Sequence, residues 1–218
     1  LGWMSETQGN PEDALRAYQD AFEANPWLLI SPYFDVSELR LKVVDDWLVR
    51  QDLPQKQVLK AYFSYQDKDM AASQRILNQR LEKAWLDEDA HALLALILQE
   101  KGDSRRAWKH VQIALLLDSS PRVLGWAAHV ARLQGKEELA ENYLQAVFRQ
   151  LAKGIRTKGY VALVYHHLAL PFDQAPQLIR PDVTPELVAG FEWLMGRYDH
   201  NDDHDKADEI EMWLDKIH

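Results

Sequence analysis

Apolar residues recur along most of the chain at the three- and four-residue spacing of amphipathic helices, and no stretch alternates in the manner of a β-strand. Proline and short polar clusters interrupt this pattern. The pattern predicts an all-α protein. The predicted helices cover residues 1–8, 12–24, 37–50, 55–66, 70–86, 90–100, 104–117, 121–133, 137–151, 159–170, 186–198 and 205–217.

A turn-forming residue followed five positions later by alanine occurs five times. The pairs are Gly9 and Ala14, Asp67 and Ala72, Gly102 and Ala107, Gly135 and Ala140, and Asp202 and Ala207. The last four turns are 35, 33 and 67 residues apart, and the last interval is close to two repeats. A period near 34 residues predicts stacked helical hairpins, in which alanine lets two crossing helices approach closely.

The first of these units resembles the second half of a tetratricopeptide repeat. The family's glycine, alanine, aromatic, alanine and proline positions are matched by Gly9, Ala14, Tyr18, Ala21 and Pro26. Residues 102–117 and 135–147 resemble the motif nearly as well, and residues 67–76 and 202–214 resemble it more weakly. Residues 27–50 and 154–183 do not fit it, so the good resemblance covers about half of the chain.

This resemblance implies a tetratricopeptide-like right-handed α–α superhelix with irregular inserts. Residues 1–153 are expected to form the helical solenoid, with an insert at 27–50. Residues 154–218 are expected to form an irregular connection and a C-terminal capping hairpin that packs on the same array. Such an array normally presents a binding surface and not a catalytic pocket.

The repeat positions that face the concave side carry a mixed polar, aromatic and cationic lining, which suits a peptide or protein segment. These candidate partner-binding residues are Gln57, Ser64, Tyr65, Leu96, Gln99, Glu100, His129 and Arg132. Some members of the family clamp a C-terminal carboxylate with lysine and asparagine. The lining lacks that pattern, so a partner of that class is not expected.

The sequence leaves three functions open. The first is a protein–protein interaction scaffold that binds another protein or an upstream domain of its own parent protein. The second rests on residues 25–40 and 169–187, which are similar to soluble C-terminal tails of bacterial O-antigen ligase, polymerase or glycosyltransferase membrane proteins. It would make this chain a non-catalytic accessory domain. The third is self-assembly, because the chain begins at Leu1 in mid-motif and half a hairpin would expose its apolar face.

Composition argues against several other classes of function. The net charge of −9 and the isoelectric point near 5.4 provide no basic footprint for nucleic acid or anionic lipid. The absence of cysteine excludes disulfides, thiolate zinc sites and a cysteine nucleophile. No apolar run reaches the roughly 18 residues that a membrane span needs. Glycine-rich phosphate loops and nucleophile elbows are also absent, so neither catalysis nor a cofactor is predicted.

His200 and His204 lie close to several carboxylates in the sequence, which raises the question of a metal site. Asn and Asp in succession favour a turn, and this stretch occupies the turn position of the last repeat. A solvated acidic turn is therefore the better interpretation, because acidic residues also suit the start of a helix. No metal is predicted. Five of the eight tryptophans fall on or beside apolar stripes and are expected to pack in the core: Trp47, Trp108, Trp126, Trp193 and Trp213. Trp3, Trp27 and Trp85 are expected to be the more exposed.

Overall fold

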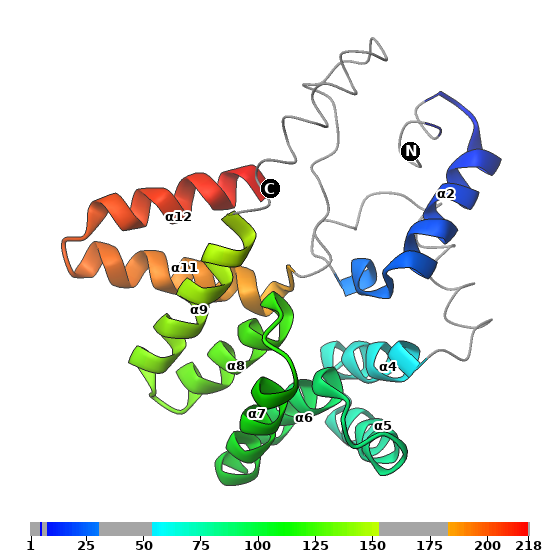
Figure 1. The fold of residues 1–218 in the computed structure, drawn as a ribbon, viewed down its shortest axis with the longest axis horizontal. Helices are drawn as coiled ribbons and strands as arrows, with labels where there is room; N and C mark the ends of the chain where they lie inside the picture. Colours follow the sequence, from blue (N-terminus) through cyan, green and yellow to red (C-terminus); the bar gives the residue numbers. More distant parts are fainter. Residues whose placement is uncertain (1–4, 6–7, 31–53, 153–182, 218) are drawn as a thin grey trace.

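The computed structural model describes residues 5, 8–30, 54–152 and 183–217, and within them the protein is all-α (Figure 1). The predicted helices at 37–50 and 159–170, and most of that at 1–8, lie outside the described residues. The described helices are α2 (Pro11–Ala24), the 3-10 helix η1 (Pro26–Ile30), α4 (Pro54–Gln66), α5 (Met70–Lys83), α6 (Glu88–Glu100), α7 (Ser104–Leu117), α8 (Pro121–Leu133), α9 (Glu137–Ala152), α11 (Pro185–His200) and α12 (His204–Ile217).

Eight of these helices pack in pairs as hairpins, as the sequence predicts. The pairs are α4–α5, α6–α7, α8–α9 and α11–α12. The first helix of each hairpin also contacts the first helix of the next, so that α4, α6, α8 and α11 lie side by side in one layer. The hairpin α11–α12 joins the array through contacts of α11 with both α8 and α9.

The turns recur at one structural position. The described residues with a positive φ angle are Gly9, Lys68, Gly102, Gly135 and Asp202, with φ between 59° and 83°. Each lies two residues before the first residue of a helix. The last four are 34, 33 and 67 residues apart. Left-handed backbone suits glycine best and aspartate better than most residues, which explains why four of these five turns could be found from their residue types.

One hairpin is displaced by one residue from its predicted alignment. The prediction placed the turn at Asp67 and the buried alanine at Ala72, whereas the structure places the left-handed residue at Lys68 and the buried small residue at Ser73. Ser73 is 0% exposed, and its hydroxyl donates a hydrogen bond to the Ala61 carbonyl at 2.6 Å. Serine therefore replaces alanine here because it is nearly as small and its polar atom is satisfied. The equivalent alanines of the other repeats are all buried: Ala14, Ala107, Ala140 and Ala207.

Short acidic side chains define where the helices start. Asp69, Asp87 and Asp103 accept hydrogen bonds from backbone N–H groups in the first turns of α5, α6 and α7. Thr184 does the same for α11, as the sequence Thr-Pro-Glu predicts. Helix α5 ends at Lys83, earlier than predicted, and residues 84–87 form a loop that leads into α6.

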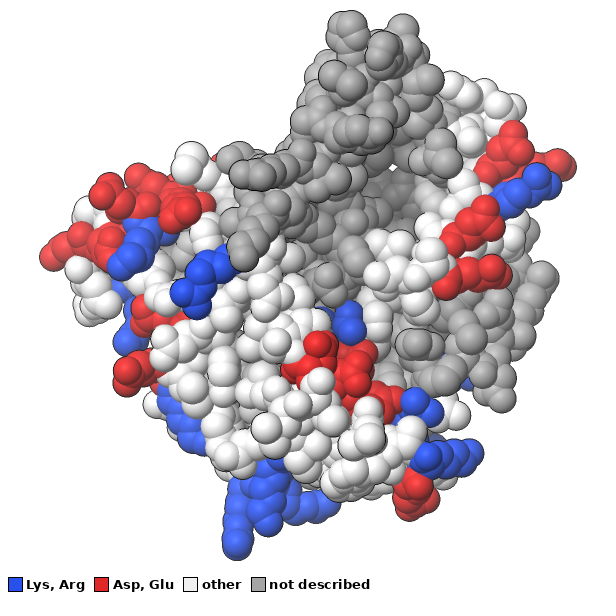
Figure 2. All heavy atoms as spheres, in the orientation of Figure 1, with Lys and Arg blue, Asp and Glu red and all other residues white. Residues whose placement is uncertain are grey.

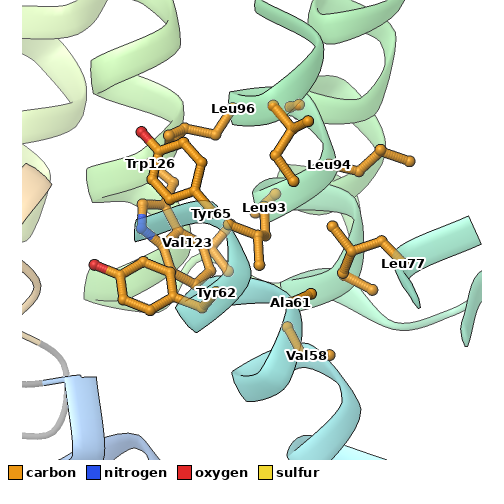
Figure 3. Close-up of a cluster of buried hydrophobic side chains, with 14 of the residues drawn as sticks. Val58, Ala61, Tyr62, Tyr65, Leu77, Leu93, Leu94, Leu96, Val123 and Trp126 are labelled. Atoms are coloured by element: carbon orange, nitrogen blue, oxygen red, sulfur yellow. The ribbon is translucent and has the colours of Figure 1, made fainter. Parts of the chain in front are cut away.

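The buried apolar side chains form two clusters that meet at α8. One extends from α2 to α8, and the other joins α8, α9, α11 and α12. Figure 3 shows part of the first cluster, where Tyr62 and Tyr65 of α4 lie close to Trp126 of α8. Tyr62 and Trp126 are both fully buried, with ring centroids 5.9 Å apart. Large aromatic side chains therefore fill the space between non-sequential hairpins.

The tryptophan predictions are only partly correct. Trp126 and Trp213 are buried as expected, and Trp85 is exposed as expected. Trp27 was expected to be exposed, but it is only 6% exposed. The 3-10 helix η1 packs its indole edge-on against Trp126, with ring centroids 6.0 Å apart. Trp3 lies outside the described residues.

Candidate protein-interaction surface

The eight residues predicted to bind a partner are carried by three neighbouring helices, and we refer to them together as the candidate face. Helix α4 carries Gln57, Ser64 and Tyr65, helix α6 carries Leu96, Gln99 and Glu100, and helix α8 carries His129 and Arg132. Because α4 contacts α6 and α6 contacts α8, the structure places these groups on adjacent elements.

Two of the eight residues contribute to the core beneath this face. Leu96 is fully buried, and Tyr65 is 7% exposed. The Tyr65 hydroxyl donates to Glu100 Oε1 at 3.1 Å, which links α4 to α6. Burial, together with the nearby carboxylates Glu186 and Glu100, raises the pKa of Tyr65 above its usual value. This tyrosine therefore stays protonated and acts as a fixed donor.

The remaining members reach the surface to different degrees. Gln57, Ser64 and Gln99 are half-buried, and Glu100 is exposed. Gln99 Oε1 accepts a hydrogen bond from Gln134 Nε2 at 2.7 Å, which ties the end of α6 to the end of α8.

Sequence reasoning missed a hydrogen-bonded cluster centred on Glu186, in the first turn of α11. Its carboxylate accepts from the Tyr62 hydroxyl at 3.1 Å and from Trp126 Nε1 at 3.2 Å. Burial and the negative charge of Glu186 raise the pKa of Tyr62. Helices α4, α8 and α11 are thereby joined through one carboxylate. Tyr62 could have been suspected from the sequence because it lies one helical turn before Tyr65.

A small cavity of about 200 Å³ opens beside the candidate face, at the meeting of α8, α9 and α11. We call it the Arg132 pocket, and it is lined by His129, Arg132, Leu133, Glu137 and Trp193. Leu133 is 52% exposed, and Trp193 is half-buried. The pocket therefore combines an accessible apolar rim with polar groups inside it.

The guanidinium of Arg132 is held in place without a carboxylate. It donates to the Ala189 carbonyl at 3.0 Å and lies 5.0 Å from the centroid of the Trp193 ring. No described carboxylate forms an ion pair with it, because Glu137 pairs with Arg197 instead. The pocket thus contains a positive charge that forms no ion pair with any described carboxylate.

His129 lines the same pocket, one helical turn before Arg132 on α8. Its Nδ1 atom is buried and has no hydrogen-bond partner among the described residues. Burial lowers the pKa of His129, and the Arg132 charge lowers it further, although Glu186 and Glu100 act in the opposite direction. The imidazole is therefore neutral at pH 7.

Charge is distributed unevenly over the surface. Figure 2 shows acidic side chains gathered over α12 and basic side chains gathered over α7. The exposed acidic residues of the hairpin α11–α12 are Glu192, Asp199, Asp202, Asp205, Asp208, Glu209, Glu211 and Asp215, and the exposed basic residues of α7 are Arg105, Arg106 and Lys109.

Over the described ranges, no group of three or more His, Asp or Glu side chains is arranged to hold a metal ion. His200 ends α11 and His204 begins α12, and the predicted acidic turn lies between them. None of the described helices combines the length and apolar character needed to cross a bilayer.

Comparison with known proteins adds only a likeness of fold. No protein-family model matches the chain, and no curated protein is detectably similar to it in sequence. Two crystal structures of MamA resemble it at a TM-score of 0.40, with 16% and 14% sequence identity. Each match covers 72% of this chain, and the matches cover 97% and 91% of the MamA chains. Similarity at this level says nothing about the partners of the present protein.

Proposed function

We propose that this protein is an interaction scaffold whose candidate face, together with the Arg132 pocket, holds a segment of a protein partner. The partner is a separate protein or another region of the same polypeptide. The observation that carries this proposal is the state of Arg132, which is fixed by a backbone carbonyl and by the Trp193 ring but has no described carboxylate partner.

The composition of the pocket supports protein recognition. Arginine and tryptophan are the residue types that most often dominate binding energy in protein interfaces, particularly in small desolvated pockets. The cavity is of the size of one or two side chains, which is too small for a typical cofactor. Leu133 extends the surface with an exposed apolar side chain next to the fixed cation.

The partner side chain that fits best is one with an acceptor oxygen and some apolar surface. An oxygen placed between Arg132 and His129 would meet a charged donor on one side and a neutral imidazole on the other. An Arg that has already lost side-chain freedom by packing on an aromatic ring binds with a smaller entropic cost. Glu100, which is exposed nearby, would disfavour a second carboxylate and so contributes to selectivity.

Affinity capture from cells of the source organism, with quantitative mass spectrometry, tests the proposal. The bait is the full chain as wild type, as the double variant His129→Ala/Arg132→Ala, or as the control Arg105→Ala on the exposed surface of α7. The double variant should lose specific partners by about tenfold, as expected for a hot-spot residue, whereas the control should retain them. Equal recovery by all three folded baits would show that this surface is not the binding site.

A further inference from the structure

A second cavity, of about 490 Å³, lies at the opposite ends of the helices from the repeat turns. It forms where the loop 84–87 meets the first turns of α6 and α8, and none of its lining residues belongs to the candidate face. We call it the Trp85 pocket. The lining residues that matter here are Arg80, Trp85, Leu86, Glu88, Asp89 and Arg122.

The floor of this pocket is a buried ion pair. Arg122 Nε and one terminal nitrogen donate to the two oxygens of Asp89, each at 2.9 Å. The same guanidinium lies 3.9 Å from the centroid of the Trp27 ring. On the pocket wall, Arg80 Nε donates to Asp87 Oδ2 at 2.6 Å.

The side chains that line the pocket carry one more negative charge than positive charges. Asp87 and Asp89 are matched by Arg80 and Arg122. Glu88 lines the same cavity and forms no ion pair with any residue in the described parts of the chain. A ligand group that enters the pocket therefore meets one uncompensated carboxylate, which favours a cation.

The rim of the pocket is apolar and exposed. Trp85 is 57% exposed and Leu86 is 72% exposed, and both occupy the short loop before α6. Adjacent exposed tryptophan and leucine side chains are unfavourable in water and frequently mark an interaction site when they flank a cavity.

Trp85 is held in position although it is exposed. Its carbonyl accepts a hydrogen bond from His91 Nε2 at 2.8 Å, and its ring stands edge-on to the His91 imidazole at 4.8 Å between centroids. His91 is itself fixed from the other side, because its Nδ1 lies 2.8 Å from Nδ1 of His110 on α7. The Asp87 side chain fixes the other end of the loop by accepting from the Ala90 N–H at 2.9 Å.

We propose that the Trp85 pocket is a second docking surface, and that it takes a partner segment carrying a lysine or arginine next to an apolar side chain. The basic group lies over the Trp85 ring and pairs with Glu88, and the apolar neighbour packs on Leu86. Because the loop is already ordered, little conformational freedom is lost on binding.

Selection from a random-peptide display library against the full chain tests this proposal. Peptides that bind the wild type but not the folded variant Trp85→Ala should be enriched in Lys or Arg beside Leu, Ile, Phe or Trp. A synthetic peptide of the selected sequence is then titrated calorimetrically. Its affinity should fall about tenfold for Trp85→Ala, as for other aromatic anchors, and about threefold for Glu88→Gln at low salt. The control Leu116→Ala, which removes another exposed leucine, should bind as the wild type does.

Salt dependence separates a charge contact from a general apolar one. Binding by the wild type should weaken at high salt, and Glu88→Gln should show a smaller salt effect. Failure to enrich any peptide, enrichment of acidic peptides, or equal binding by Trp85→Ala would each overturn the proposal. Light scattering that shows a wild-type dimer abolished by Trp85→Ala would also overturn it, since the occupant would then be a second copy of this chain. None of these results depends on His129 or Arg132, so the two surfaces are tested separately.

Discussion

Replacing Arg122 with methionine removes the cation that neutralises Asp89 beneath the Trp85 pocket. Both side chains of this pair are only 9% exposed, so water cannot solvate the Asp89 carboxylate once the guanidinium is gone. Methionine fills a similar volume beside Trp27, although it removes the guanidinium from the face of that ring, and it leaves the buried Asp89 carboxylate without this cation. Removal of one partner from a buried ion pair typically lowers the free energy of unfolding by about 3–5 kcal/mol.

The pH dependence of this loss identifies its cause. Burial raises the pKa of Asp89 from 3.8 to about 6, against the lowering effect of Arg122, and the pKa should rise further when Arg122 is absent. A carboxyl whose native pKa lies above its unfolded value stabilises the fold most when it is protonated, and this contribution is lost as pH rises through the native pKa. The loss caused by Arg122→Met should therefore be largest at about pH 8 and shrink to about 1–2 kcal/mol at about pH 5, where Asp89 is protonated and what is missing is the hydrogen bonds and the contact of the guanidinium with Trp27.

Urea unfolding followed by circular dichroism measures both values. The double variant Asp89→Asn/Arg122→Met should regain most of the stability at the higher pH, because both charges of this pair are then removed. Arg106→Met is the control, because its partner Asp103 is 38% exposed and such surface pairs contribute about 1 kcal/mol or less. An equal loss for Arg122→Met at both pH values would refute the argument from an unpaired carboxylate.

Three further predictions concern the helix crossings. Gly190→Ala would place a Cβ atom 2.8 Å from Leu144 Cδ2 and should lower the free energy of unfolding by about 1–3 kcal/mol, measured by urea denaturation. Gly196→Ala, where nothing lies within 4 Å, should instead raise it by about 0.5–1 kcal/mol, and equal effects at the two glycines would contradict this account. Ala107→Trp should lower the free energy of unfolding through overpacking by at least about 1–3 kcal/mol, seen as a lower melting temperature, whereas the exposed Ala71→Trp should not.

The local elements could be predicted because their causes lie close together in the sequence. The turn at Gly102, the N-cap at Asp103 and the buried Ala107 lie within six residues and specify the start of α7 together. The same reasoning placed the buried small residue of α5 at Ala72, one position before its true place at Ser73. Only the structure shows that the serine hydroxyl donates its hydrogen bond to the carbonyl of Ala61 in α4. A pattern that requires alanine at the buried small position does not detect a serine there.

The candidate face could be predicted only as far as the repeat extends. His129 and Arg132 were found because they lie on a helix of the regular array, but Trp193 and the Ala189 carbonyl, which hold Arg132, come from α11 beyond residues 153–182. Glu186 likewise meets Tyr62 across 124 residues and Trp126 across 60. Those contacts depend on the curvature of the layer formed by α4, α6, α8 and α11. That curvature is the sum of small rotations between successive hairpins. Periodicity determines that hairpins stack, but side-chain packing at each interface determines which distant residues meet. For that reason the repeat pattern places His129 and Arg132 on α8, but it does not show that Trp193 and the Ala189 carbonyl of α11 meet Arg132 there.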